Sequence, residues 1–266
     1  MVKPASRTLT RSPPPPRTAP QKSPPKAPEG ERLSKRVMQL KGCSRTEAEQ
    51  YIAGGWVTVD GTVVEEPQAR VSTQTVALAP DASLLNLMAI TILLNKPPNV
   101  TAANAHTLLT LETHFSGDTS GTRPLKRHLL KLESHVLLET GASGLMVFSQ
   151  DWRTTRKLVE DMASMEHELM VEVAGEVDPE ALQPIQRALN SDRQALPQAK
   201  ISVNSTTPER SKLRLAVKGA HPGLAAHLCE LAQLEILALR RVRLGRVALG
   251  DLPQGQWRYL GAHERF

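Results

Sequence analysis

The chain has 266 residues, of which 40% are hydrophobic and 23% are charged, with a net charge of +6. This composition excludes a wholly disordered or fibrous protein, and the length suits a large domain with or without a small one. Cys43 and Cys229 are the only cysteines, which excludes a disulfide scaffold and fits a reducing compartment. The longest nearly apolar run, 84–94, contains Asn86 and is too short to cross a bilayer. We therefore expect a cytoplasmic protein that does not span a membrane.

Residues 1–30 carry most of the basic surplus. They contain nine of the 20 prolines and six basic residues against the single acidic Glu29, so five of the six net positive charges lie there. This composition predicts a disordered or polyproline-like tail. The tail is a basic arm attracted to phosphate, or a solubilising tail without a partner. A transit peptide is a third option, which the prolines disfavour, and no apolar segment indicates a secretory signal.

Residues 31–78 are typical of a small domain built around two helices. The apolar residues of 33–40 recur at helical spacing and predict a first helix that the Gly42-Cys43 pair ends. Ser44 and Glu47 then form a capping-box pattern, which predicts the start of a second helix.

A hairpin is expected after the second helix, which stops at the glycine pair 54–55. Residues 56–59 and 62–64 are strands by content, and the Asp60-Gly61 pair between them is a strong signal for a tight turn.

The helix pair offers a set of residues that suit phosphate. The candidates for RNA binding are Arg32, Lys35, Arg36, Lys41, Ser44 and Arg45. Cationic side chains and the N–H groups at a helix start can hold phosphate, although an ordinary solvated helix face is the alternative interpretation.

The run RLSKRVMQLKGCSRTEAEQYIAGGWVTVDGTVV resembles the small RNA-binding domain named after ribosomal protein S-four. The resemblance implies two helices against a short hairpin sheet, with structured RNA docking on the helix pair.

A linker at 79–89 leads to a second domain at 90–262. The predicted strands lie at 90–94, 135–138, 145–149, 169–173, 200–204, 212–217, 235–239 and 256–260. The predicted helices lie at 152–162, 179–189 and 224–232. Strands with irregularly interspersed helices indicate an α+β domain with a mixed, largely antiparallel sheet.

Three segments of this domain carry a second resemblance. The segments are ILLNKPPNV, HVLLETGASGLMVFSQD and LRRVRLGRVALGDLPQGQWRYL. In order and spacing, they resemble the opening strand, the catalytic signature and the closing segment of the ribosomal RNA pseudouridine synthases. The resemblance implies isomerisation of uridine to pseudouridine in structured ribosomal RNA, a role in ribosome biogenesis, and no cofactor. No histidine lies at structural-zinc spacing from a cysteine or second histidine, so no metal is expected. We expect a monomer.

The catalytic signature departs from the family pattern. Aligned on 143–145, the family's catalytic Asp position is Glu139 and the position of its partner Arg is Leu137. Glutamate moves the carboxylate by about 1.5 Å, and a misplacement of about 1 Å can cost on the order of a hundredfold in rate. Leucine removes the cation that would fix the carboxylate and keep it ionised.

Other positions that would touch the substrate also differ. Leu169 stands where the family has a Tyr that stacks on the target base, and 219–227 has lost nearly all the fixed positive charge of a basic RNA-binding stretch. Arg241 and Arg243 are further candidates for RNA backbone contact, and strand alternation places them on one side. A solvated strand edge is the alternative for this pair.

Framework segments such as 249–253 keep the family pattern while the substrate-contacting positions have changed. The favoured hypothesis is an RNA-binding protein whose catalysis is impaired or absent. One alternative is an active synthase that uses Glu139 as its carboxylate. Another is a protein-interaction module built on the same scaffold.

Overall fold

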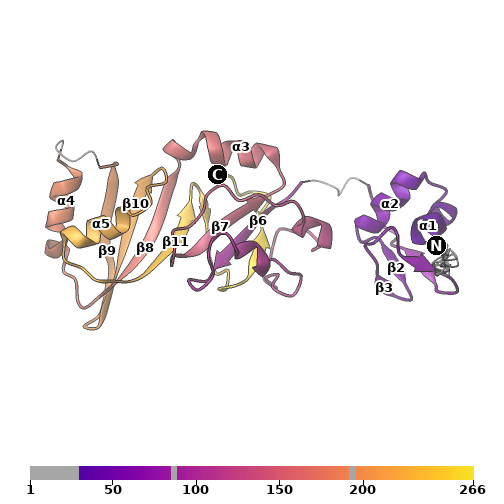
Figure 1. Ribbon diagram of the computed structural model, residues 1–266, viewed down its shortest axis with the longest axis horizontal. Coiled ribbons are helices and arrows are strands. Elements are labelled where there is room, and N and C mark those ends of the chain that lie inside the picture. The colour runs from indigo at the N-terminus through magenta and orange to yellow at the C-terminus, as the bar shows by residue number, and fades with distance from the viewer. Residues whose placement is uncertain (1–29, 85–88, 192–195) are drawn as a thin grey trace, which may run out of the picture.

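A computed structural model describes residues 30–84, 89–191 and 196–266. It shows a small N-terminal domain and a larger domain built around one extended sheet (Figure 1). Of the disordered tail expected over residues 1–30, residues 1–29 lie outside the described residues. The α+β class is confirmed, as is the arrangement of a small helical domain followed by a mixed sheet.

The small domain packs two helices against short strands. Its elements are β1 (Glu31–Arg32), α1 (Leu33–Lys41), α2 (Arg45–Ala53), β2 (Val57–Val59), β3 (Thr62–Val63), β4 (Arg70–Val71) and β5 (Val76–Leu78). The sheet order is β3-β2-β5, and β1 pairs separately with β4. Leu33, Val37 and Ile52 from the helices meet Val57 and Val71 in one buried core. The sequence did not indicate β1, β4 or β5.

Local signals explain the two helices and the hairpin. The Ser44 hydroxyl accepts the Glu47 backbone N–H at 3.2 Å, and the Glu47 carboxylate accepts the Ser44 N–H at 2.8 Å. This reciprocal cap confirms the predicted start of α2. Asp60 and Gly61 both have positive φ, 49° and 79°. That geometry matches the twist of a two-residue hairpin and confirms the predicted turn.

The large domain follows, with its longer elements in chain order. They are β6 (Thr91–Lys96), β7 (Ser143–Ser149), α3 (Trp152–Glu160), β8 (Glu166–Ala174), α4 (Gln183–Leu189), β9 (Ala199–Thr206), β10 (Arg210–Lys218), α5 (Leu224–Leu231), β11 (Ile236–Leu244), β12 (Val247–Ala248) and β13 (Trp257–Tyr259). Short 3-10 helices lie at η1 (Ala105–Leu108), η2 (Lys126–Leu129), η3 (Met162–Ser164) and η4 (Pro179–Leu182).

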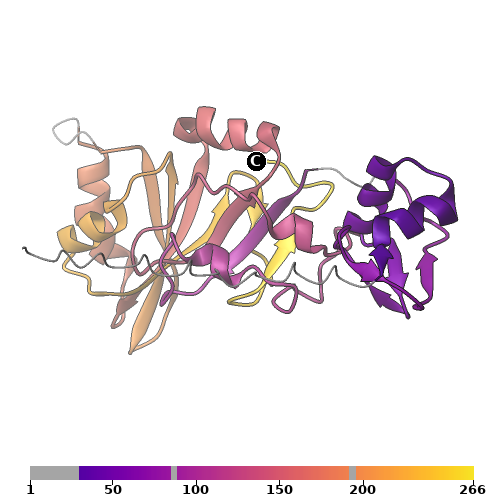
Figure 2. The same ribbon diagram turned by 45° about the vertical axis from the view of Figure 1, so that its right-hand side comes forward.

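One sheet organises this domain, in the order β13-β6-β7-β11-β8-β10-β9, with β12 beside β11. Among the described strand pairs of this sheet, β7 with β11 is parallel and the others are antiparallel. The helices α4 and α5 gather at the β9–β10 end, and the small domain lies beyond the opposite end (Figures 1 and 2). The helix α3 packs over β6 and β7 through Leu158, which joins Leu93 and Val147 in a buried cluster.

The predicted strand at 135–138 is wrong. This segment is a loop, although Val136 and Leu138 are both buried and Leu137 between them is exposed. The alternation that indicated a strand arises because the two buried side chains join separate core clusters. The loop leads directly into β7 and determines where residue 139 lies.

Gly144 fixes the junction between β7 and β11. It has φ +99°, and a Cβ atom there would lie 2.2 Å from the Arg241 carbonyl oxygen. Only glycine permits this approach and conformation. The family-like Ser-Gly pair at 143–144 is therefore a packing requirement at the centre of the sheet.

Described residues of the two domains contact one another. Glu65 accepts the Lys126 backbone N–H at 2.7 Å, and Glu66 pairs with the Lys126 ammonium at 2.8 Å. Leu125 lies against Gly55 beside them. No helix among the described residues is long and apolar enough to cross a membrane.

Candidate functional site

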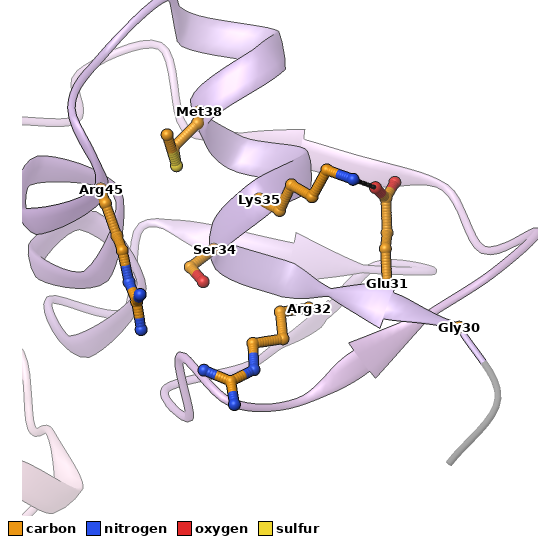
Figure 3. Close-up of a pocket in the computed structure, with 7 residues that line it drawn as sticks. All are labelled: Gly30, Glu31, Arg32, Ser34, Lys35, Met38 and Arg45. Carbon is orange, nitrogen blue, oxygen red and sulfur yellow. Dashed lines mark ion pairs between the residues drawn. The ribbon is translucent and has the colours of Figure 1, made fainter. Parts of the chain in front are cut away.

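A hollow of about 660 Å³ opens on the small domain, where β1, α1 and the start of α2 meet. We call it the N-terminal hollow; it is lined by Gly30, Glu31, Arg32, Ser34, Lys35, Met38 and Arg45. The side chains of Arg32, Ser34 and Arg45 extend into the same space, and Lys35 turns towards Glu31 (Figure 3). The predicted residues Arg32, Lys35 and Arg45 are therefore brought together.

The lining of this hollow has a net positive charge, because three basic residues line it against one acidic residue. Lys35 lies 3.9 Å from the Glu31 carboxylate, and Arg45 pairs with Glu49 at 2.8 Å. Arg32 is exposed and forms no ion pair with any described residue. The arrangement suits a phosphate or another oxyanion, because guanidinium groups donate several N–H groups in a fixed fork.

The other three candidates of this domain lie outside the hollow. Arg36 pairs with Glu31 at 2.6 Å and donates to the Ser72 carbonyl. Lys41 is exposed at the far end of α1. Ser44 caps α2, and hydrogen bonds from its backbone N–H and then from its side chain lower the pKa of the Glu47 carboxyl. A carboxylate at that helix start disfavours phosphate there, so the geometry does not support the expected anion contact by Ser44.

Ser34 is a lining residue that sequence reasoning missed. It is buried, and its hydroxyl faces the hollow (Figure 3). Its only sequence signal was a polar residue between Arg32 and Lys35 in a position that the helical pattern buries. Patterns of charge did not reveal it because serine is neutral.

A second, much smaller cavity of about 50 Å³ lies against the sheet of the large domain. We call it the central pocket; its lining is Leu137, Leu138, Glu139, Ala142, His167, Leu169, Val217, Gly219, Ala220, His221, Pro222, Leu224, Leu239 and Arg241. The 135–142 loop, the strands β8, β10 and β11, the segment before α5 and the first residue of α5 contribute these residues. The positions that the catalytic resemblance singled out thus converge in space, Leu137, Glu139 and Leu169 among them.

A turn positions Glu139 at the mouth of the pocket. Its carbonyl accepts the Ala142 N–H at 3.1 Å, and Gly141 within the turn has φ +79°. The Glu139 carboxylate forms no ion pair or hydrogen bond with the described residues. Leu137 lines the same pocket but is 58% exposed, and its apolar side chain offers no charge to the carboxylate.

Arg241 forms the buried cationic wall of the same pocket. It is 2% exposed, and its guanidinium donates to the Leu145 and Val136 carbonyls at 2.8 and 2.7 Å. Burial without a carboxylate partner lowers its pKa to about 10. Burial, followed by the charges of Arg241 and His221, lowers the pKa of the neighbouring His167 to about 4. His167 is therefore neutral at physiological pH, and its Nε2 has no partner among the described residues.

The expectation that Arg241 and Arg243 share a side is wrong. A register shift between them interrupts the alternation of β11. Arg241 faces the central pocket, whereas Arg243 lies on the opposite face and binds Glu166 and Glu168. The Arg241 guanidinium is buried and hydrogen-bonded to backbone carbonyls. In this structure it is therefore not accessible to an RNA backbone. Within the described chain, no three His, Cys, Asp or Glu side chains are grouped to hold a metal.

Comparisons with known proteins agree with both parts of the fold. Residues 31–76 match the S4 domain family. The ribosomal large subunit pseudouridine synthase B of Yersinia pestis is 24% identical over 234 residues, covering 86% of this chain and 72% of that protein. An uncharacterized RNA pseudouridine synthase of Mycobacterium tuberculosis (strain ATCC 25618 / H37Rv) is 25% identical over 242 residues, covering 89% and 92%.

The large sheet has the fold of a pseudouridylate synthase. A crystal structure of such a protein superposes with a TM-score of 0.51 at 16% identity, covering 86% of this chain and 95% of the other. The architecture is thus an S4 domain followed by a pseudouridine synthase fold. Over most of its length the chain is similar in sequence to these two RNA pseudouridine synthases. The exact boundaries of tail, linker and second domain stay predictions.

Proposed function

We propose that this protein binds structured RNA through its S4 domain and that its pseudouridine synthase domain is catalytically impaired or inactive. The observation that carries the proposal is the contrast between a cationic N-terminal hollow of about 660 Å³ and a central pocket of about 50 Å³. Ribosomal RNA is the proposed ligand, because a relative is named for the large ribosomal subunit. The setting we infer is cytoplasmic ribosome assembly, with the protein acting as a monomer.

The size of the central pocket supports the loss of activity. A pocket of about 50 Å³ has room for a water or two, well short of the roughly 300 Å³ at the lower end of small-molecule sites. A flipped-out nucleotide needs a pocket shaped to its base. In this structure Leu169 and Leu224 narrow the space.

The electrostatics support the same conclusion. The family reaction breaks the bond between N1 of uracil and the sugar, turns the base, and rejoins it through C5 with loss of the C5 proton. A carboxylate must meet the nucleotide in a fixed position for this chemistry. No ion pair joins Glu139 to a described residue, and the resemblance assigns the holding role to position 137, which is an uncharged leucine.

One observation favours the alternative of an active synthase. Glu139 and the Arg241 guanidinium line the same pocket. A change of side-chain rotamer that brought the two together would supply a paired, ionised carboxylate. In that case Glu139 acts as the catalytic carboxylate and Arg241 as its positioning residue.

A pseudouridine map of ribosomal RNA from cells with and without the gene separates these two functions. The impaired-enzyme proposal expects identical maps. A site that disappears on deletion, returns with the wild-type chain and fails to return with Glu139→Gln establishes the alternative. Because Gln keeps the shape and removes the charge, the comparison isolates the carboxylate.

A further inference from the structure

One half of the large sheet has an uncovered face. Along β10 the side chains alternate strictly, and Leu213 and Leu215 pack with Ile185 of α4 and Leu228 of α5 on the covered side. Their neighbours along the strand point to the other side, where Lys212, Arg214 and Lys218 are exposed. This second side is opposite the central pocket, which Leu169 and Val217 line from the covered side.

The strand register places a defined set of charges on the uncovered face. Ala216 of β10 lies opposite Lys200 of β9, and Met170 of β8 lies opposite both Arg214 of β10 and Arg240 of β11. Directly paired residues point to the same face of a sheet. The basic members are Lys200, Arg210, Lys212, Arg214, Lys218, Arg240 and Arg243, and the acidic members are Glu166, Glu168 and Glu172.

Each acidic residue of β8 on this face forms an ion pair with at least one of three arginines. Glu168 accepts from Arg214 at 2.6 Å and from Arg243 at 2.9 Å, and Glu166 also binds Arg243. Glu172 pairs with Arg210 at 2.6 Å. The Arg214 and Arg243 guanidinium groups hold the pKa of the Glu168 carboxyl below its usual range, so these pairs stay charged at neutral pH.

Four exposed cations remain: Lys200, Lys212, Lys218 and Arg240. None of them forms an ion pair with a residue that the structure describes. We name this set the back-face cations. They extend across four adjacent strands, about 14 Å at roughly 4.8 Å per strand, and about 20 Å along β10 at roughly 3.3 Å per residue.

We propose that the back-face cations form a second RNA-binding surface, on the side of the sheet away from the central pocket, that contacts the phosphate backbone. Residues 31–266 have a net charge of only about +1, so four unpaired cations on one face are a local concentration of charge. Phosphate contacts by lysine and arginine give affinity without base specificity.

The surface suits a nucleic acid better than a protein. Protein interfaces depend on a dry apolar centre, and the large apolar side chains at this face are sparse: Met170 at a paired position and the exposed Leu237 in the β11 bulge. Exposed Ser202 and Asn204 of β9 add short polar groups beside Lys200. The proposal goes beyond binding by the N-terminal hollow and rests on the proposed function only in taking RNA as the ligand.

The test is the salt dependence of RNA binding by the full chain. Lys200→Gln, Lys212→Gln, Lys218→Gln and Arg240→Gln are combined in one variant, and affinity for a structured ribosomal RNA fragment is measured between 50 and 300 mM salt. Four lost phosphate contacts should lower the slope of log K against log salt by about three. At the lowest salt, the Kd should rise by more than tenfold.

A matched variant changes the same charge elsewhere in the large domain: Lys131, Arg153, Arg187 and Arg246, each replaced by Gln. We expect its slope to stay close to that of the wild type. A variant with Lys200, Lys212 and Lys218 replaced by Arg, and Arg240 by Lys, should keep the wild-type slope. This charge-conserving variant separates lost charge from lost packing if the neutralised chain is less stable.

Equal slopes for the neutralised and matched variants would overturn the proposal. Polyglutamate serves as a second ligand that mimics an acidic protein. The proposal is also overturned if the neutralised variant binds RNA as the wild type does and loses affinity only for polyglutamate, which would indicate an acidic protein partner. A wild-type chain with no salt-dependent RNA affinity defeats the proposed function itself. RNA binding that depends on Arg32 and Arg45 but not on the back-face cations leaves that function standing and removes this second surface.

Discussion

Arg32 and Arg241 are both arginines without a carboxylate partner among the described residues, yet their surroundings are opposite. Arg32 is exposed in an open hollow, whereas Arg241 is buried and bound to two backbone carbonyls. An exposed guanidinium can exchange water for phosphate at little cost. A buried guanidinium such as that of Arg241 has replaced its hydrogen bonds to water by hydrogen bonds to backbone carbonyls. It stabilises the fold and is not accessible to phosphate in this structure.

The same contrast extends to the regions around the two arginines. The N-terminal hollow gathers exposed cations on a small domain with its own core. The central pocket is assembled from a loop, three strands and the start of α5, which all depend on the large sheet. Changes in the first region should therefore alter binding, and changes in the second should mainly alter stability.

The largest expected effect is on the frame of the central pocket. Gly144→Ala would place a Cβ atom 2.2 Å from the Arg241 carbonyl oxygen at φ +99°. We expect a loss of roughly 3 kcal/mol in the free energy of unfolding, measured by urea denaturation. Gly141→Ala is the matched control, since Gly141 also has positive φ but open space around it, and should cost about 1 kcal/mol. Equal costs for the two would show that the close approach is not tight.

The next effect concerns pH. The folded pKa of His167 is about 4 against 6.5 for the free side chain, so below pH 6.5 the unfolded chain binds more protons than the folded one. Stability from this group is complete above pH 6.5 and falls as the pH drops towards 4. Between pH 7 and 5 the loss should be about 2 kcal/mol.

His167→Gln should remove that part of the pH dependence, as read from urea unfolding at pH 7 and 5. His227→Gln, at an exposed position on α5, should leave it in place. A His167 variant with the same loss between the two pH values as the wild type would show that this histidine is accessible to protons in the folded state.

A smaller effect, on binding alone, tests the N-terminal hollow. Replacing Arg32 and Arg45 together by Gln should weaken RNA affinity roughly tenfold and lower the salt slope by about two, because each removes a charge-assisted phosphate contact. Lys41→Gln with Arg36→Gln, outside the hollow, serves as the matched pair. If the matched pair weakens binding as much as the hollow pair, the hollow is not where the RNA docks.

The smallest expected effect is that of attempted rescue. Leu137→Arg, Glu139→Asp and Leu169→Tyr together restore the residues that the family signature places in the central pocket. We expect pseudouridine formation to stay undetectable, because the pocket remains near 50 Å³ and segment 219–227 lacks the basic side chains of the family. Turnover by the triple variant would show that those three positions alone account for the impairment.

The second helix and the hairpin of the small domain could be predicted from the sequence because short-range interactions determine them. The Ser44–Glu47 cap and the Asp60-Gly61 turn are determined by neighbours within four residues, and both are confirmed. Convergence of Leu137, Glu139 and Leu169 followed from the resemblance, because their positions depend on pairings far apart in the chain.

What sequence reasoning missed in the large domain depends on tertiary structure. The register shift in β11 separates Arg241 from Arg243 and places them on opposite faces, and no local pattern indicates such a shift. The 135–138 loop alternates like a strand because its side chains join two cores. The back-face cations could be recognised only once the strand register was known.

The most direct test of the account is a tritium-release assay on the purified full chain with ribosomal RNA labelled at C5 of uridine, run beside a binding measurement on the same sample. Pseudouridine formation must release the C5 hydrogen, so release reports the reaction itself. We predict salt-dependent binding without release above background. Release that follows the amount of protein and stops with Glu139→Gln would contradict the account and identify a working synthase.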